Sequence, residues 1–307
     1  MDIIRVTSQE YAKFAPAMLH IFNSTQFCEL NKDKCDAVHY LILKDSKVRA
    51  GIILGEREDG LYSPFSAPFG GLSIKTDEKL ELITNAVGTL KKYGKELNKT
   101  IKITLPPAIY NETAITKIAT AVLLTGAKIT HSDINYHYEL SRFPNYKNHL
   151  SRNARKNFKN AMTKDWEFAV LNNSDESISI AYNIIKANRE SHGYPLRMSL
   201  QSVLDTNKVI PADFMVLRLN GEAIAAAQVF HVANGIAQVI YWGDAPGYSE
   251  LRPMNWFTYK IFEHYHNLGL RVLDIGPSSE KGIPSFGLCD FKEGIGCIPT
   301  LKHSFSL

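Results

Sequence analysis

The sequence is poor in the residues that mark disulfide-rich and metal-binding proteins. Its 307 residues include only four cysteines, Cys28, Cys35, Cys289 and Cys297. They are too few and too widely spaced for a disulfide framework or a paired-cysteine zinc site, so we expect reduced, structural thiols. The histidines are scattered, and His264 and His266 stand two apart on one expected helix, where they face different sides. The sequence therefore predicts no metal ion.

Long apolar runs are also missing. No stretch approaches eighteen uninterrupted apolar residues, and Asp2, Arg5 and Glu10 stand where a signal peptide requires an apolar block. We therefore expect a cytoplasmic protein with no membrane span. The net charge is only +4, which suits small anionic ligands better than a long run of duplex phosphates, so we expect no DNA partner.

The chain instead contains a long internal repeat. The segment HYLILKDSKVRAGIILGEREDGLYSPFSAPFGG, an expected helix and IKITLPP return as DFMVLRLNGEAIAAAQVFHVANGIAQVIYWGDAPG, a second helix and RVLDIGP. The offset stays near 170 residues, which is far too long for a solenoid repeat. Two copies of one domain-sized fold explain it, with a boundary near residues 143–145. We therefore expect domains over residues 1–144 and 145–307.

Both halves show the same order of expected elements, namely three strands, a helix and a strand, with the proline- and glycine-rich stretch 61–74 in the place of the third strand of the first half. In the second half Asn220-Gly221 and Asn234-Gly235 are turn signals between strand-like runs. The expected elements are strands at 40–43, 48–54, 101–105 and 135–140 and helices at 77–94 and 113–124 in the first half, and strands at 167–171, 214–219, 222–230, 236–242 and 271–275 and helices at 150–164, 175–189 and 254–268 in the second. This order indicates an α/β class with a mixed, mostly antiparallel sheet, and it excludes Rossmann and barrel folds, which alternate strand and helix.

Each half resembles the GNAT (acyl-CoA N-acyltransferase) fold, and the whole chain resembles the tandem-GNAT, FemAB-like group of acyl and aminoacyl transferases. The motifs that carry the resemblance lie in the second half: GIAQVIYWGDAPGY, LGLRVLDIGP and CDFKEGIG, the last similar to the "FKxxFG" region of that group. The resemblance implies a cleft where strands 236–242 and 271–275 splay apart and unpaired backbone N–H groups hold the acyl carbonyl oxygen.

Such a cleft would open around Tyr241, Trp242, Gly243 and Gly276. We expect Tyr241 to orient the substrate or protonate the leaving group, although Tyr241 and Trp242 are equally explained as half-buried strand aromatics. The resemblance also assigns Lys292 to charge stabilisation, with a surface lysine paired to Asp290 or Glu293 as the alternative. Asp274 is a weaker candidate for deprotonating the attacking amine.

The donor-binding loop of ordinary GNAT enzymes contains paired glycines that this chain lacks. The corresponding stretch, GYSELRPMNWF, keeps Arg252 at an expected helix start, with Asn255 in the first turn. Arg252 there is a candidate for a phosphate or carboxylate, or else a solvated surface arginine. The donor is accordingly left open between acyl-CoA and aminoacyl-tRNA, the donor of FemAB-like transferases.

Two loops complete the candidate site. Ser278 and Ser279 follow the strand at 271–275 in a turn suited to anion recognition, or to a plain loop. In the first half Phe69, Gly70 and Gly71 occupy the place of the acyl-binding strand, and the prolines around them indicate a degenerate site, used either for the acceptor or for packing.

A basic amphipathic helix is expected at 150–164, where Arg152, Arg155, Lys156, Lys159 and Lys164 occur without an intervening acid. It is either a tRNA-attracting surface or a solvated face. The sequence thus supports an N-acyltransferase acting on a primary amine, with a small molecule such as a cell-wall precursor as the expected acceptor. The alternative is a non-catalytic module that binds a nucleotide-linked or peptidoglycan-precursor ligand. The sequence reveals neither the identity of the acceptor nor the oligomeric state.

Overall fold

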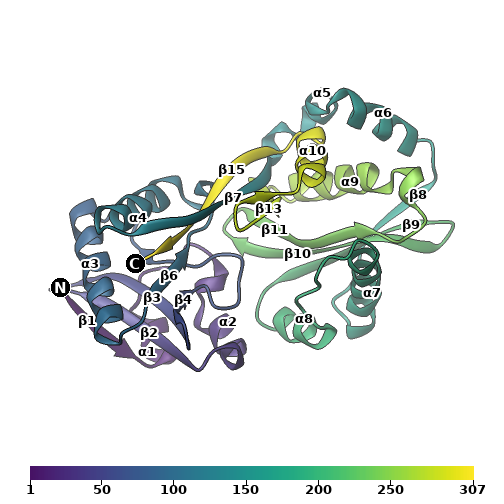
Figure 1. Cartoon of the computed structure of the whole chain (residues 1–307). Coiled ribbons are helices and arrows are strands. Elements are labelled where there is room, and N and C mark those ends of the chain that lie inside the picture. Colours follow the sequence, from purple (N-terminus) through teal and green to yellow (C-terminus); the bar gives the residue numbers. More distant parts are fainter. The chain divides into compact units, whose positions relative to one another are not determined.

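The computed structural model describes all 307 residues and divides into two compact units (Figure 1). Unit 1 comprises Met1–Ile134, Ser279–Ile283 and Thr300–Leu307, and unit 2 comprises Asn135–Ser278 and Pro284–Pro299. Each contains a mixed, mostly antiparallel set of strands with helices packed against it, which confirms the expected α/β class. No helix is both long enough and apolar enough to cross a membrane.

Unit 1 is built on a sheet whose strands follow one another in the order β1, β2, β3, β4, β6, β15 and β7. Their bounds are β1 (Asp2–Val6), β2 (Ala37–Lys44), β3 (Val48–Arg57), β4 (Gly60–Ser63), β6 (Ile101–Thr104), β15 (Ile298–Ser306) and β7 (Lys128–Glu139), with β5 (Ser73–Ile74) beside β3 and the pair β13 (Ser279–Glu280) and β14 (Ile283–Pro284) forming a separate ribbon. The helices are α1 (Ser8–Phe14), η1 (Ile21–Asn23), α2 (Thr25–Leu30), η2 (Lys32–Lys34), α3 (Leu80–Glu96), η3 (Ala108–Tyr110) and α4 (Glu112–Leu124).

Alternation along β2 gives this sheet two apolar faces. Leu41 and Leu43 belong to the core that includes the buried side of α3 and α4, whereas Tyr40 and Ile42 belong to a second cluster with Tyr11 of α1. Side chains on a strand point alternately to opposite faces, so a run of buried residues requires cover on both sides. This explains why 40–43 is apolar throughout.

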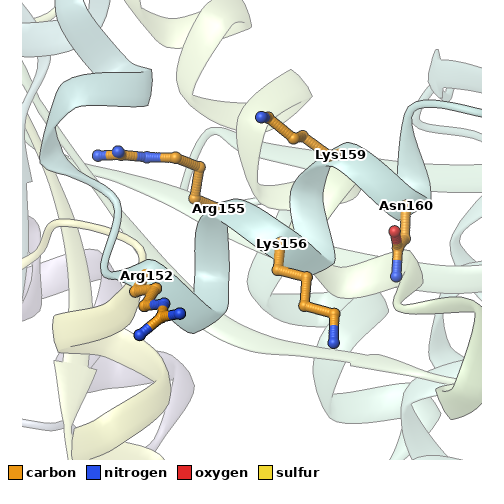
Figure 2. A pocket seen from close by; sticks show the side chains of 5 residues that line it. All are labelled: Arg152, Arg155, Lys156, Lys159 and Asn160. Carbon is orange, nitrogen blue, oxygen red and sulfur yellow. The ribbon is translucent and has the colours of Figure 1, made fainter.

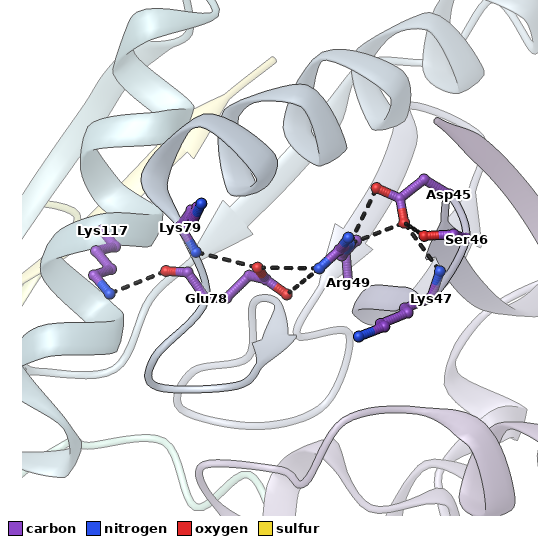
Figure 3. Close-up of polar contacts among 7 residues, drawn as sticks. All are labelled: Asp45, Ser46, Lys47, Arg49, Glu78, Lys79 and Lys117. Atoms are coloured by element: carbon purple, nitrogen blue, oxygen red, sulfur yellow. Dashed lines mark hydrogen bonds and ion pairs between the residues drawn. The ribbon is translucent and has the colours of Figure 1, made fainter.

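Helix α3 begins at Leu80 and not at Asp77, where the sequence predicts its start. Glu78, two residues before this start, is held in a turn. Its carboxylate accepts from Arg49 Nη1 at 3.4 Å and from the Lys79 amide at 3.1 Å, and its carbonyl accepts from Lys117 Nζ at 3.0 Å (Figure 3). Arg49 is in turn bound to Asp45 of the β2–β3 turn at 2.9 Å. These contacts hold Glu78 in the loop, so helix α3 begins only after this residue.

Unit 2 has strands in the order β7, β12, β11, β10, β9 and β8. Their bounds are β12 (Val272–Pro277), β11 (Ile236–Asp244), β10 (Glu222–Ala233), β9 (Ala212–Leu219) and β8 (Trp166–Val170), with helices η4 (Leu140–Asn145), α5 (Tyr146–His149), α6 (Arg152–Ala161), α7 (Asp175–Ser191), α8 (Leu200–Asn207), η5 (Ser249–Leu251), α9 (Pro253–Asn267) and α10 (Phe286–Gly294). In Figure 1, α7 and α8 lie on one side of these strands and α9 and α10 on the other.

The turn signals of the second half are confirmed. Asn220 and Gly221 both have positive φ, 51° and 82°, between β9 and β10, and Gly235 has φ 69° before β11. Positive φ is the conformation that Asn-Gly turns of tight hairpins require. α9 begins with Pro253, as its fixed φ favours, and Gly269 follows it with φ 74°.

The two units differ from the expected domains 1–144 and 145–307. The chain passes from unit 1 to unit 2 within β7, between Ile134 and Asn135, and its end returns to unit 1. There Ser304–Ser306 of β15 pair with Lys102–Thr104 of β6, while Asn135–Glu139 of β7 pair with β12 in unit 2. The C-terminal part of the last strand of each repeat, 135–139 of β7 and 300–306 of β15, therefore lies in the unit built mainly from the other repeat, which a division at one chain position does not represent.

Candidate functional site

The strands β11 and β12 part in unit 2. They pair in parallel at only three positions, the last of which joins Gln238 to Asp274, although β11 runs on to Asp244 and β12 to Pro277. β11 also has a bulge opposite β10, which shifts the register between Val239 and Tyr241. A bulge re-aims the strand locally. The splay that the sequence predicts beneath Tyr241 is thus present.

Asp274 fixes the point of parting. Its side chain is fully buried, Oδ1 accepts from Asn135 Nδ2 at 2.8 Å and from the Gly276 amide at 2.9 Å, and Oδ2 accepts from Gln238 Nε2 at 2.9 Å. Gly276 has φ 76°, so its amide can turn back onto Asp274 and away from β11. The carboxylate is enclosed by protein donors. As a base for an incoming amine, Asp274 would first have to lose some of these bonds.

Lys292 of α10 holds the end of β12. Its Nζ donates to the carbonyls of Ile275, Gly276 and Pro277 at 3.1, 2.9 and 3.0 Å, and the residue is only 4% exposed. An ammonium group has three protons, and these three carbonyls accept them. Stabilisation of a substrate oxyanion by Lys292 would require it to exchange one of these bonds, so its position is that of a residue shaping the strand end.

A half-buried aromatic and cationic cluster lies beside Tyr241. The Arg189 guanidinium of α7 sits 5.0 Å from the Tyr241 ring centroid and 5.7 Å from that of Tyr194, and its Nε donates to the Pro195 carbonyl at 2.8 Å. No carboxylate pairs with Arg189. Burial lowers the pKa of Arg189 and raises that of Tyr241, whose shift the Arg189 charge opposes. We name Arg189, Tyr194 and Tyr241 the Arg189 cluster.

Sequence reasoning missed Arg189 and Tyr194. A cation at the end of an expected helix, followed by His192-Gly193-Tyr194-Pro195, reads as an ordinary solvated terminus. The signal that identifies Arg189 is the contact with a strand residue more than fifty positions later in the chain, which only the folded structure supplies.

Gly243 is placed by α7. Asn188 donates Nδ2 to the Asp244 carbonyl at 2.7 Å, and a Cβ on Gly243 would overlap its amide. Gly243 is therefore needed for the approach of helix to strand. Trp242 faces away from the cluster and contacts Phe291 of α10, with ring centroids 6.2 Å apart.

Arg252 and Asn255 stand at the start of α9. Arg252 occupies the left-handed region with φ 58°, its side chain is 44% exposed, and Nη2 lies 4.0 Å from exposed Glu250. Asn255 is 7% exposed in the first turn. The exposed guanidinium beside a helix N-terminus is consistent with the predicted anion contact.

The two serines after β12 differ. Ser278 is 2% exposed and its hydroxyl has no partner, whereas Ser279 belongs to unit 1, where its hydroxyl donates to Asp133 Oδ1 at 2.8 Å and accepts from the Ile134 amide at 2.8 Å. Ser279 thus fastens its loop to β7 within unit 1.

Unit 1 contains the same parting of strands, but there it is filled. β4 and β6 pair in parallel up to Ser63 and Ile103, and beyond them the Gly70 amide donates to the Thr104 carbonyl at 2.9 Å and the Gly71 amide to Ser63 Oγ at 2.9 Å. A Cβ on Gly70 would lie 2.6 Å from that Oγ, so only glycine fits.

Phe69 completes this plug. It is fully buried in edge contact with His20, Phe22 and Tyr110, with centroids 4.8 to 5.3 Å apart. In this conformation Phe69, Gly70 and Gly71 offer no surface to a ligand, because they pack the interior of unit 1.

The structure groups no three histidine, cysteine or acidic side chains that could hold a metal ion, and all four thiols are free. Comparison with protein-family models and with curated sequences finds no match. Comparison with solved structures does find similar chains.

The chain is similar to FemX (12% identity over 100% of this chain and 97% of the other, TM-score 0.69). It is also similar to L-PGS from Bacillus licheniformis (10% identity, 97% and 90% covered, TM-score 0.62) and to a tandem GNAT protein from the clavulanic acid biosynthesis pathway (7% identity, 100% and 98% covered, TM-score 0.52). At such identities the likeness concerns the fold. The chain has a tandem GNAT fold.

Proposed function

We propose that this protein is an N-acyltransferase whose active site is the parting of β11 and β12 in unit 2. The observation that carries the proposal is the contrast between the two repeats. The parallel strands part in both units. In unit 1 residues 69–71 seal the gap between them, whereas in unit 2 β12 turns away from β11 at Gly276. A sequence that keeps one such gap and its flanking polar groups is best explained by use of that gap.

The reaction is direct aminolysis. The nitrogen of a primary amine attacks the acyl carbonyl carbon, the C–S or C–O bond to the carrier breaks, and the amine proton ends on the leaving thiol or hydroxyl group. Backbone N–H groups of β11 beyond Gln238 stabilise the developing oxyanion. Tyr241 orients the acyl group or protonates the leaving group, and Lys292 and Asp274 hold the strand end in place.

Cationic side chains near the parting of β11 and β12 bind the donor. Arg252 takes the anionic part of the donor, which is acyl-CoA or aminoacyl-tRNA. The Arg189 cluster adds a guanidinium without a carboxylate partner, held between two tyrosine rings and so already ordered for an anion. The acceptor is a primary amine, and the likeness to FemX favours a cell-wall precursor.

The test is acyl transfer to a panel of amines from acetyl-CoA and from a charged tRNA pool, followed by mass spectrometry. Tyr241→Phe keeps the ring over Arg189 and removes the hydroxyl, so kcat should fall by about a hundredfold if the hydroxyl transfers a proton. Tyr40→Phe is the matched control, since its hydroxyl belongs to unit 1, where it donates to Glu29 at 2.8 Å. Equal rates for both variants would contradict the role of Tyr241.

One observation favours a second candidate function. Asp274 and Lys292, two charged residues at the parting, are both engaged by protein atoms. A binding module that holds a nucleotide-linked or peptidoglycan-precursor ligand needs no free base. Saturable ligand binding without turnover from either donor would support that module and reject the transferase.

A further inference from the structure

A histidine in unit 1 is hydrogen-bonded to a tyrosine on one side and to a carboxylate on the other. His39 of β2 is 1% exposed. Its Nδ1 lies 2.7 Å from the hydroxyl oxygen of Tyr93 of α3, and its Nε2 lies 2.8 Å from Oε2 of Glu56 of β3. The rings of His39 and Tyr93 meet edge to face, with centroids 6.0 Å apart. We call Tyr93, His39 and Glu56 the His39 triad.

Strand pairing and helix packing bring the triad together. His39 pairs with Leu54 across β2 and β3, and Glu56, two residues further along β3, points to the same face of the sheet. Leu41 also lies on that face, in the core that includes the buried side of α3, and Tyr93 packs against this core from the last turn of the helix. The geometry of the triad is therefore fixed by the fold of unit 1.

The carboxylate decides which ring nitrogen of His39 carries the proton. The hydrogen bond with His39 lowers the pKa of Glu56, so at neutral pH Glu56 is ionised and can only accept. Nε2 of His39 must then donate to it. Burial lowers the pKa of His39, which keeps the ring neutral. Nδ1 therefore presents a lone pair, and the Tyr93 hydroxyl donates its proton to it.

A cation acts on the same pair. Arg5 of β1 donates to the Val38 carbonyl at 3.3 Å. Its charge adds to the lowering that burial causes in the pKa of His39, and it opposes the rise that burial causes in the pKa of Tyr93. The phenol is thus neutral at rest and needs a base as it reacts, while Arg5 stabilises charge on its oxygen. Arg5 is exposed and Tyr93 is half-buried, so a small reagent can approach from solvent.

We propose that Tyr93 is a nucleophilic tyrosine that takes an acyl group from a small activated ester or thioester. Tyr93 Oη attacks the acyl carbonyl carbon, and its proton passes to His39 Nδ1. The bond from that carbon to the leaving oxygen or sulfur breaks, the leaving group takes the proton from His39, and an O-acyl tyrosine remains. A hydroxyl, a neutral base and a carboxylate that orients the base are the parts that such a step requires.

The activity is separate from the proposed N-acyl transfer, because no residue of the His39 triad lies at the parting of β11 and β12. It needs neither an amine acceptor nor a carrier. Its occurrence therefore does not depend on the outcome of the amine-transfer assay.

The test is incubation of the full chain with p-nitrophenyl acetate, followed by peptide mapping by mass spectrometry. Tyr93 should carry the acetyl group and should react at least about a hundredfold faster than Tyr248, because a general base assists it. Tyr248 is also half-buried, and its hydroxyl donates to Glu222 at 2.7 Å without a histidine. Non-specific acetylation is measured at Lys156 and Lys159, two exposed lysines that extend from α6 (Figure 2).

Three variants assign the reaction. His39→Gln keeps a donor and an acceptor but cannot take up a proton, so the rate at Tyr93 should fall at least about a hundredfold. Tyr93→Phe keeps the ring beside His39 and should lose this label entirely. Tyr248→Phe is the matched control and should leave the rate at Tyr93 unchanged. If His39→Gln does not fold, the comparison of Tyr93 with Tyr248 in the wild type decides.

Acetylation of Lys156 and Lys159 without acetylation of Tyr93 would overturn the proposal. Equal rates at Tyr93 and Tyr248, or at Tyr93 in the wild type and in a folded His39→Gln protein, would overturn it too. A labelled Tyr93 in a protein that transfers no acyl group to any amine would reject the proposed function and keep the nucleophilic tyrosine. Amine transfer with an unlabelled Tyr93 would do the reverse.

Discussion

Gly243 illustrates how one side chain, or its absence, sets the wall of the candidate site. The Asn188 amide lies against its Cα and bonds the next carbonyl, so α7 and β11 touch at this residue. The sequence indicates Gly243 as part of a site through a family motif. The structure supplies a packing reason, because Arg189, the next residue on α7, reaches Tyr241 only if the helix approaches this closely.

We predict that Gly243→Ala destabilises the protein by about 1–3 kcal/mol, since the added Cβ displaces Asn188. Chemical denaturation followed by circular dichroism would measure this. Gly88→Ala is the control: it is inside α3, has nothing within 4 Å of the added Cβ, and should be neutral or stabilising by up to about 1 kcal/mol. A Gly243→Ala protein as stable as the wild type would show that Asn188 moves freely.

His20 gives unit 1 a dependence on pH. Burial lowers the pKa of His20 to about 4, and its Nε2 lies 3.3 Å from the Gly70 carbonyl within the plug. Because the unfolded chain binds the proton more readily, the free energy of unfolding is highest above about pH 6.5 and falls as the pH falls toward 4. The total decrease that His20 causes is about 3 kcal/mol.

The measurement is the unfolding free energy of wild type and His20→Gln between pH 4 and 7. Gln can still donate to the Gly70 carbonyl but does not titrate, so the difference between the two proteins should change by about 3 kcal/mol across this range. Parallel curves would mean that His20 accepts a proton in the folded state without cost.

At the scale of elements, β12 and α10 are joined by one side chain. The three carbonyls that Lys292 collects are consecutive, which a strand in regular pairing does not present to one donor. The curvature at Gly276, with φ 76°, makes this possible, and Asp274 holds the same turn from the other side through the Gly276 amide. The parting of strands is therefore built into the loop between strand and helix.

Replacement of Lys292 by Met should lower the unfolding free energy by about 3 kcal/mol, because it leaves buried carbonyls without a donor. Hydrogen exchange should increase most at residues 275–278. Lys186→Met on α7, where the lysine is 51% exposed and 3.8 Å from exposed Glu190, should change stability by less than about 0.5 kcal/mol. A Lys292→Met protein with unchanged exchange at 275–278 would refute the anchoring role.

At the scale of the whole molecule, the repeats exchange their last strands. The end of β15 is part of unit 1: Phe305 is 1% exposed in its core, and Ile101 and Leu307 exchange backbone hydrogen bonds of 3.4 and 2.9 Å. Unit 1 is therefore assembled from both ends of the chain, and neither half of the sequence contains a complete sheet.

We predict that removal of residues 300–307 unfolds unit 1, because it exposes the edge of β6 and the cavity left by Phe305. The loss would appear as protease cleavage within residues 1–134 and as a separate, lower melting transition. Phe305→Ala should give a milder form, with a cost of about 3–5 kcal/mol. A truncated protein with protected β2 and β3 amides would show that the first repeat is complete without β15.

The sequence alone determined what depends on neighbours along the chain. The hairpin turns at Asn220-Gly221 and Asn234-Gly235, the helix that begins at Pro253 and ends before Gly269, the mixed α/β class and the duplication all follow from local backbone preference and hydrophobic period. Even the parting of β11 and β12 was predicted, through the family resemblance of its motifs.

Only the tertiary structure decided how those elements are shared and which side chains remain accessible. It placed Asp274 and Lys292 inside closed sets of hydrogen bonds, sealed the first repeat with Phe69 to Gly71, and brought Arg189 to Tyr241. It also placed residues 135–139 of β7 and 300–306 of β15 in the unit built mainly from the other repeat. These outcomes depend on contacts between residues tens to hundreds of positions apart, and no periodicity or turn signal in a linear sequence records such contacts.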